Sequence, residues 1–246
     1  LSLRSLLEEN LKGFSWRGHS DTETLIECFA AWGVEKTIGM AVGMFSFALW
    51  DTKDKLLTLA RDRLGEKPLY WGWSDDFLIF ASELKAIKAH PGFKAEINRD
   101  SLTLFLRHGY VPAPYSIYRS IQKLMPGHFI EINLGGDISV SKSANSRVYW
   151  SVNDVVKEGL IRPFSGSASD AVDVLEAQLK ASVSDQMLSD VSLGAFLSGG
   201  IDSSTIVALM QSQTRTPVKT FTIGFDENGY NEAIHAKAVA RHLGTN

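Results

Sequence analysis

The pattern of apolar residues predicts two amphipathic helices at the start of the chain. In the first, leucines recur at helical spacing up to Gly13, a residue type that commonly ends helices. In the second, Ser20 and Asp21 offer capping side chains and Gly33 follows the last apolar position. The apolar positions are Leu3, Leu6, Leu7 and Leu11 in the first helix and Leu25, Ile26, Phe29 and Trp32 in the second. Cys28 lies inside the second helix.

The next part of the chain has the pattern of paired strands. Apolar runs on either side of Lys53-Asp54 predict an antiparallel hairpin, and a second hairpin is expected around residues 74–76. Helices are expected at 83–90 and 99–109, and a strand near residue 130. Strand pairs placed between helices, without regular strand-helix alternation, indicate an α+β antiparallel layered domain over residues 1–157.

A change in the order of predicted helices and strands marks a second domain. Residues 158–169 are rich in Gly, Ser and Pro and are the expected linker. The order from residue 170 is helix, strand, helix, strand, helix. The expected ranges are 170–190, 193–197, 202–213, 218–225 and 231–243. This order is typical of parallel strands with right-handed crossovers, so residues 170–246 are expected to be part of an α/β parallel-sheet domain.

Composition and charge exclude several function classes. The 246 residues carry a net charge of -3 without a run of Lys or Arg, which disfavours nucleic-acid partners. The longest apolar stretch, residues 38–50, is too short to span a membrane, and the first residues lack the apolar core of a signal peptide. A single cysteine fits a reducing compartment. We therefore expect a soluble, cytoplasmic protein. Since the chain lacks an initiator Met and stops where another strand is expected, we expect an internal fragment.

Residues 198–204, Ser-Gly-Gly-Ile-Asp-Ser-Ser, carry the strongest chemical signal. They lie between an expected strand and an expected helix, at the sheet edge where ligands of open α/β folds bind. The two glycines let backbone N–H groups approach an anion, and the helix that follows directs its positive end to the same place. The hydroxyl groups of Ser198, Ser203 and Ser204 are additional candidate donors. The segment therefore predicts a phosphate-binding loop.

Asp202 distinguishes this loop from the Walker loop, in which a Lys precedes the final Ser or Thr. A carboxylate among phosphate-binding groups would repel phosphate unless a Mg²⁺ ion stood between them. Asp202 is therefore the candidate metal ligand. The alternative is a Gly-Gly turn whose Ser and Asp residues only cap a helix. The strand-loop-helix context favours nucleotide binding.

Residues 198–204 resemble the pyrophosphate loop of the N-type ATP pyrophosphatases. Five upstream segments are similar to the asparagine synthetase family and occur in the order of that family. They are residues 18–33, 43–51, 59–71, 80–87 and 124–132. The resemblance covers nearly the whole chain. It implies part of an N-terminal-nucleophile glutaminase domain joined to part of an ATP-pyrophosphatase domain.

The resemblance also implies a reaction. Glutamine would supply ammonia, and ATP with Mg²⁺ would activate aspartate as β-aspartyl-AMP. Attack by ammonia would then release asparagine, AMP and pyrophosphate. The alternatives are a relative that amidates a sugar acid, a β-lactam-forming synthetase, or a non-catalytic nucleotide-binding fragment. The segment leaves open the acceptor acid and the oligomeric state, including a homodimer.

Specific residues match functional positions of the family. Asp21 matches the carboxylate that pairs with the α-amine of glutamine, which is the favoured role, with helix capping as the alternative. Leu197 and Ile223 match positions whose main chain holds adenine, with strand burial as the alternative. Asp226 and Glu227 match the start of a second ATP-facing turn. The implied ATP-binding set is Leu197, Ser198, Gly199, Gly200, Ile201, Asp202, Ser203, Ser204 and Ile223.

Other family features are structural or have no match. Nothing here matches the N-terminal Cys nucleophile or the distal synthetase residues, so this chain alone is expected to be inactive. Cys28 is interpreted as a core residue because it lies in mid-helix without a free amine. The segment 61–67 is interpreted as structural, with a turn at Gly65. Its expected charged network consists of Arg61, Asp62, Arg63 and Lys67.

Overall fold

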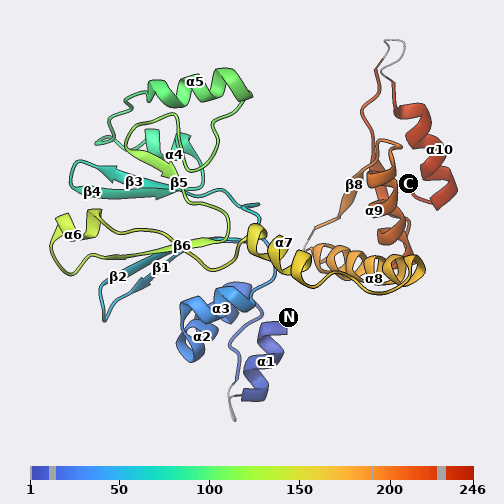
Figure 1. Ribbon diagram of the computed structural model, residues 1–246, viewed down its shortest axis with the longest axis horizontal. Helices are drawn as coiled ribbons and strands as arrows, with labels where there is room; N and C mark the ends of the chain where they lie inside the picture. Colours follow the sequence, from blue (N-terminus) through green and yellow to red (C-terminus); the bar gives the residue numbers. More distant parts are fainter. Residues whose placement is uncertain (1, 11–14, 190, 226–230) are drawn as a thin grey trace. The chain divides into compact units, whose positions relative to one another are not determined.

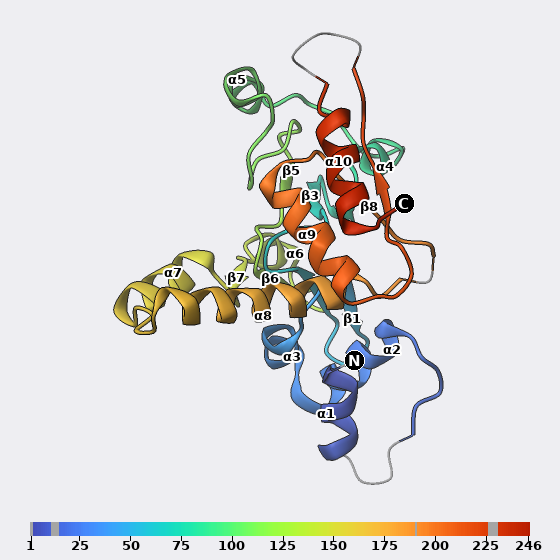
Figure 2. The same cartoon turned by 90° about the vertical axis from the view of Figure 1, so that its right-hand side faces the viewer.

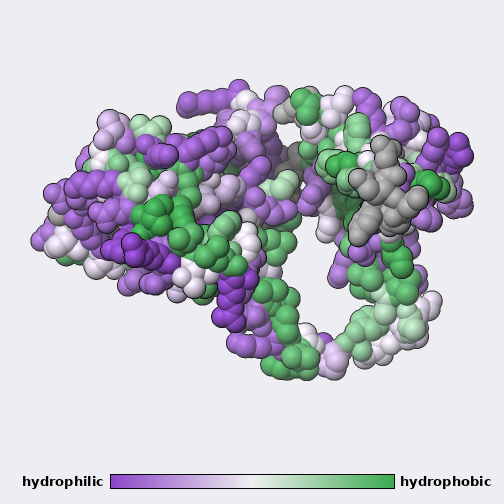
Figure 3. Space-filling model, turned by 90° about the horizontal axis from the view of Figure 1, so that it is seen from above, coloured by the Kyte–Doolittle hydropathy of each residue, from purple (hydrophilic) through white to green (hydrophobic). Residues whose placement is uncertain are grey.

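The computed structural model describes residues 2–10, 15–189, 191–225 and 231–246 and divides into two compact units (Figure 1). The first unit ends at Ile161 and the second begins at Arg162. None of the described helices is long and apolar enough to cross a membrane. Apolar side chains reach the surface in both units (green in Figure 3).

Three helices open the first unit: α1 (Ser2–Asn10), α2 (Asp21–Trp32) and α3 (Val34–Met40). The first two confirm the prediction, although Gly13, the expected terminator of α1, lies outside the described residues. Helix α2 ends at Gly33, which has a φ of 79°. Helix α3 was not expected. The hydroxyl of Thr37 donates to the carbonyl oxygens of Gly33 (2.8 Å) and Cys28 (3.1 Å), which ties α3 to the end of α2.

Two antiparallel sheets form the body of the first unit, as the layered α+β prediction required (Figure 1). Both predicted hairpins are confirmed, with Asp51 opposite Leu56 in one and Ser74 opposite Phe77 in the other. One sheet has the order β1-β2-β6-β7: Ser46–Asp51, Leu56–Arg61, His128–Asn133 and Arg147–Val148. The other has the order β4-β3-β5: Phe77–Ala81, Tyr70–Ser74 and Ile121–Lys123.

The larger sheet is buried on both faces. On one face, alternate residues of β2 and β6 pack against Trp71 of β3 in the main core of this unit. This core consists of Leu57, Leu59, Leu69, Trp71, Leu124, Ile130 and Ile132. On the other face Ala60 and Phe129 pack with Ile38 of α3. Side chains that alternate along a strand point to opposite faces, so β2 and β6 contribute to both cores. Each fully buried Leu or Ile contributes about 1.5–3 kcal/mol relative to exposure.

Four more helices complete the first unit: α4 (Leu84–Lys88), α5 (Arg99–His108), α6 (Ile138–Lys142) and α7 (Val152–Ile161). The predicted α5 is capped by Asn98 and ends at Gly109, whose φ of 76° is left-handed. Helix α7 was not expected and occupies the first part of the proposed linker. The apolar side chains of α7 are exposed.

The second unit has the predicted alternation of helices and strands (Figure 2). Its elements are α8 (Ala168–Gln186), β8 (Gly194–Phe196), α9 (Ile201–Ser212), β9 (Lys219–Phe221) and α10 (Ala233–Leu243). Strands β8 and β9 are parallel, which confirms the predicted sheet type. Helix α9 is shared by two cores, because Met210 packs with Val183 of α8 and Val207 packs with Ala236 of α10.

Asn246, three residues after α10, lies beside the sheet. The N–H of Asn246 donates to the carbonyl oxygen of Val218 (3.0 Å), and the N–H of Thr220 donates to that of Asn246 (2.6 Å). This is the hydrogen-bond pattern of parallel strands. The carbonyl oxygen of Phe221 instead accepts from Leu197, after β8, so Asn246 lies along the other edge of β9.

The segment 61–67 is a turn held by hydrogen bonds to the main chain. Asp62 is 1% exposed, and its two carboxylate oxygens accept the N–H groups of Glu66 and Lys67, each at 2.9 Å. Gly65, with a φ of 70°, confirms the expected turn. The guanidinium of Arg61 donates to the carbonyl oxygens of Gly65, Lys67 and Leu124. The prediction of a charged network was wrong. Within the described chain, the four side chains predicted to form it make no ion pairs with one another.

Asp62→Ala is expected to destabilise the first unit by about 2–4 kcal/mol, because two partly buried hydrogen bonds of the turn lose their acceptor. Denaturant unfolding of the purified chain, followed through tryptophan fluorescence, measures this change. Asp54→Ala, in the exposed turn of the first hairpin, is the matched control and should change stability by less than about 0.5 kcal/mol. Equal stability of the two variants would contradict the structural role of Asp62.

The proposed domain bounds, with a linker at 158–169, remain a prediction. The part of this window without helix is residues 162–167, between α7 and α8. Phe164 is 56% exposed there, so limited chymotrypsin digestion is expected to cut first after Phe164. Intact mass measurement of the early fragments tests this expectation. Earlier cleavage between residues 43 and 63 would contradict it.

Candidate functional site

The loop at residues 198–204 connects β8 to α9 and is anchored on its strand side. Leu197 is buried, its N–H donates to the carbonyl oxygen of Phe221 (2.9 Å), and its own carbonyl oxygen accepts the hydroxyl of Thr222 (2.6 Å). Gly199 has a φ of 84°, and a Cβ there would lie 2.8 Å from the amide nitrogen of Ala236. The close approach of α10 therefore requires glycine at this position.

Serine side chains hold the loop in shape. The hydroxyl of Ser203 accepts the N–H of Ser198 (3.2 Å) and lies 2.9 Å from the hydroxyl of Ser198, which in turn accepts the N–H of Gly200 (3.3 Å). The hydroxyl of Ser204 is enclosed and lacks a hydrogen-bond partner among the described residues. Ser204 was predicted to offer its hydroxyl to phosphate. In this structure protein atoms separate that hydroxyl from the surface.

Backbone N–H groups, rather than hydroxyls, are the donors that remain free. Within the part of the chain that the structure describes, four of them lack an acceptor: those of Gly199, Ile201, Asp202 and Ser203. Three of these belong to the first turn of α9, whose N–H groups have no partner inside the helix. The positive end of the helix dipole adds to their attraction for an anion. The loop therefore has the donors that a phosphate group requires.

Asp202 is exposed in the first turn of α9, and its carboxylate has neither a hydrogen-bond nor an ion-pair partner among the described residues. The N-cap of α9 is Gly200, without a side-chain capping bond. The alternative reading of Asp202 as a helix cap was therefore wrong. The described residues contain no group of three or more His, Cys, Asp or Glu that could hold a metal ion. A single carboxylate fits a Mg²⁺ ion that takes its other ligands from phosphate and water.

The two predicted adenine contacts differ in their surroundings. The N–H of Leu197 is hydrogen-bonded to β9, and its carbonyl oxygen accepts the hydroxyl of Thr222 just after that strand. Ile223 lies beyond the end of β9, and its side chain is 69% exposed. The strand was predicted to continue to Phe225. It ends at Phe221 because β9 pairs only along the three residues of β8. Asp226 and Glu227 lie outside the described residues.

Asp21 is the first residue of α2, and its carboxylate is exposed. The N-cap is Ser20, whose hydroxyl accepts the N–H of Thr22 (3.1 Å). Oδ1 of Asp21 accepts the same N–H at 2.7 Å, whereas its Oδ2 has no partner within the described residues. Ser20 therefore performs the capping that was the alternative role for Asp21. One carboxylate oxygen of Asp21 remains free.

The sequence patterns missed the role of Glu23, whose spacing from Ser20 would suit helix capping. Its carboxylate instead accepts the N–H groups of Arg17 (2.7 Å) and Gly18 (3.0 Å), in the loop before the helix. Spacing alone could not show this, because a Glu at the third helical position suits either contact.

Cys28 is fully buried in α2, as predicted for a core residue. Burial, together with the nearby charge of Glu27, raises the pKa of its thiol. A buried thiol with a raised pKa holds little thiolate, which is the reactive form. Cys28 is therefore unsuited to act as a nucleophile.

Comparison with protein families assigns the class of the first unit. The model described as "Glutamine amidotransferase domain" matches residues 2–150, and the model described as "Asparagine synthase" matches residues 174–246. The chain belongs to the family of glutamine amidotransferase domains, and its C-terminal part matches asparagine synthase. Both assignments agree with the resemblance seen in the sequence.

The chain is similar to curated proteins named asparagine synthetase. The chain is 33% identical to "Asparagine synthetase [glutamine-hydrolyzing] 1" of Bacillus subtilis over 99% of its own length and 36% of that protein. It is 35% identical to a "Putative asparagine synthetase [glutamine-hydrolyzing] 2" of Methanocaldococcus jannaschii, over 92% of its length and 42% of that protein. The chain thus spans less than half of these curated relatives. A solved glutamine phosphoribosylpyrophosphate amidotransferase from B. subtilis is similar at 15% identity and a TM-score of 0.42, covering 100% of this chain and 66% of that one.

Proposed function

We propose that the full-length protein is a glutamine-hydrolysing asparagine synthetase. The observation that carries this proposal is the order of the two family matches, glutamine amidotransferase at residues 2–150 and asparagine synthase at 174–246. A protein with both parts can release ammonia from glutamine in one and use it in the other. The proposed acceptor is aspartate, activated by ATP as β-aspartyl-AMP and amidated with release of AMP and pyrophosphate.

The residues of the second unit receive roles consistent with their geometry. The free N–H groups of the loop at 198–204 would bind phosphate oxygens of ATP, and the main chain near Ile223 would face adenine. Asp202 would hold Mg²⁺ against those oxygens. When bound, the ion would neutralise the charge that develops on the leaving pyrophosphate. Without the ion, the Asp202 carboxylate would repel the phosphates that the neighbouring N–H groups attract.

In the first unit, Asp21 is proposed to bind the α-ammonium group of glutamine. Its exposed carboxylate has a free oxygen, and a charge-assisted hydrogen bond to an ammonium is stronger than a neutral one. This contact would select substrates with an α-amino group. It would have no part in the use of free ammonia by the second unit.

Product analysis tests the proposed reaction. Purified full-length protein is incubated with aspartate, ATP and Mg²⁺, and with either glutamine or ammonia, and asparagine, AMP and pyrophosphate are quantified. We expect the three products in equal amounts from both nitrogen donors. Turnover only when a sugar acid replaces aspartate would assign the other acceptor class. Binding of ATP without turnover of any acceptor would contradict the enzymatic proposal.

A further inference from the structure

Glu23 makes a two-point contact with the loop that leads into α2. One carboxylate oxygen accepts the N–H of Arg17 and the other accepts the N–H of Gly18, at 2.7 and 3.0 Å. Arg4, on α1, donates from its guanidinium to the carbonyl oxygen of Gly18 at 2.6 Å. The N–H and the carbonyl oxygen of Gly18, three residues before Asp21, are therefore both held by hydrogen bonds with side chains.

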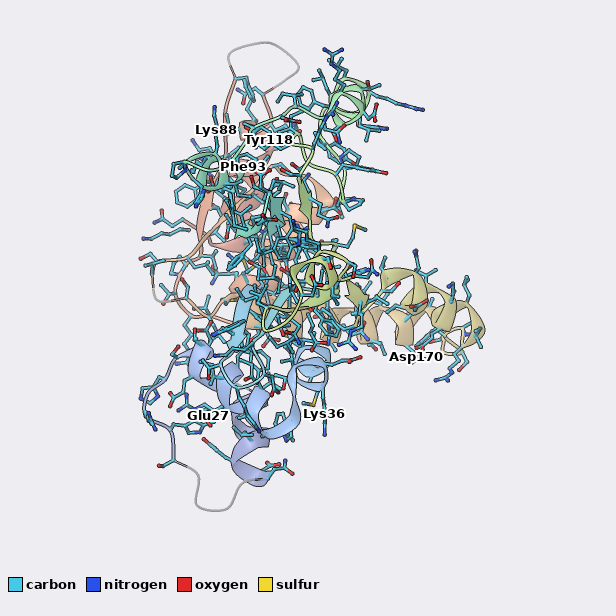
Figure 4. The ribbon with its side chains drawn as sticks, turned by 90° about the vertical axis from the view of Figure 1, so that its left-hand side faces the viewer. Glu27, Lys36, Lys88, Phe93, Tyr118 and Asp170 are labelled. Atoms are coloured by element: carbon cyan, nitrogen blue, oxygen red, sulfur yellow. The ribbon has the colours of Figure 1, made fainter. Side chains whose placement is uncertain are left out.

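This contact differs from ordinary helix capping. In α8 the third helical residue, Asp170 (Figure 4), accepts the N–H of its N-cap Ser167 and completes a capping box. Glu23 holds the same third position in α2 but reaches back past the N-cap to the loop. Its carboxylate therefore shapes the chain outside the helix, whereas the cap of α2 is supplied by Ser20.

The loop also packs closely against this carboxylate. A Cβ at Gly18 would lie 3.4 Å from Oε2 of Glu23, at the limit of ordinary contact. Hydrogen bonds to a charged acceptor are stronger than neutral ones, so the pair of contacts restrains the loop directly before Asp21. A carboxylate that binds a small substrate needs such restraint, because its direction must be set before the substrate arrives.

We propose that Glu23 is a positioning residue of the glutamine site, which holds residues 17–20 so that the free oxygen of Asp21 points to the substrate ammonium. The inference rests on the proposed role of Asp21. Glu23 itself does not contact the substrate, since both of its oxygens are occupied by the loop.

Glu23→Gln in the full-length protein provides the first test. The Gln side chain has nearly the same size as that of Glu. Its amide NH₂ group, however, replaces one carboxylate oxygen and would face a backbone N–H donor instead of accepting from it. We expect the KM for glutamine to rise about tenfold, with kcat at saturating glutamine and ammonia-dependent synthesis close to wild type. Glu27→Gln, on the same helix (Figure 4), is the matched control and should leave the KM unchanged. The melting temperatures of the two variants should agree within about 2 °C.

The double variant shows whether Glu23 acts through Asp21. If it does, Asp21→Ala combined with Glu23→Gln should have the same KM for glutamine as Asp21→Ala alone. A further tenfold rise in the double variant, an unchanged KM in Glu23→Gln, or an equal loss with ammonia would each overturn the positioning role. An unchanged KM in Asp21→Ala would instead show that the proposed contact of Asp21 with glutamine is wrong.

Discussion

Asp202→Asn is expected to reduce ATP-dependent synthesis by at least about 100-fold while glutamine hydrolysis in the other unit continues. The carboxylate lies in the first turn of α9, next to backbone N–H groups that have no acceptor among the described residues and are proposed to bind phosphate. Asparagine keeps the shape of the side chain but removes the charge that would hold Mg²⁺. Since Gly200 is the N-cap, the substitution leaves the capping of α9 unchanged.

Pyrophosphate release at saturating ammonia and Mg²⁺ measures this effect. Asp185→Asn, at an exposed position of α8, is the matched control and should retain wild-type turnover. Near wild-type turnover in Asp202→Asn would contradict the proposal that Asp202 binds Mg²⁺. A parallel loss of glutamine hydrolysis would show that the substitution disturbs the whole protein rather than the metal site.

Asp21→Ala is expected to raise the KM for glutamine by about 10- to 100-fold, with ammonia-driven synthesis nearly unchanged. This range corresponds to the loss of one hydrogen bond between charged groups. Steady-state kinetics with each nitrogen donor measures the two effects separately. A glutamine analogue that lacks the α-amino group should bind the variant and the wild type equally, because it cannot make the lost contact.

Asp100→Ala is the matched control, because Asp100 also lies in the first turn of an exposed helix, α5. It should leave the KM for glutamine unchanged. Equal losses with glutamine and ammonia in Asp21→Ala would indicate a folding role for Asp21 and contradict the proposed contact.

The positions of α2, both hairpins and the alternating elements of the second unit follow from the sequence alone. Each depends on local signals: capping by Ser20, turn residues between apolar runs, and glycines where the backbone adopts a left-handed conformation. Local signals also located the loop at 198–204, because its glycines and its strand-helix context are adjacent in sequence.

Only the tertiary structure decided what individual polar groups do, because their partners depend on contacts that spacing does not specify. Asp62 was expected in a charged network, but its buried carboxylate accepts two backbone N–H groups of the turn that follows it. The Ser204 hydroxyl, expected to donate to phosphate, is enclosed by protein atoms. Glu23 suits a capping box by spacing, yet the fold of the preceding loop brings Arg17 and Gly18 to its carboxylate. A carboxylate or hydroxyl can satisfy several partners equally well, so the sequence determined where these groups lie along the chain and the packing determined which partner each one has.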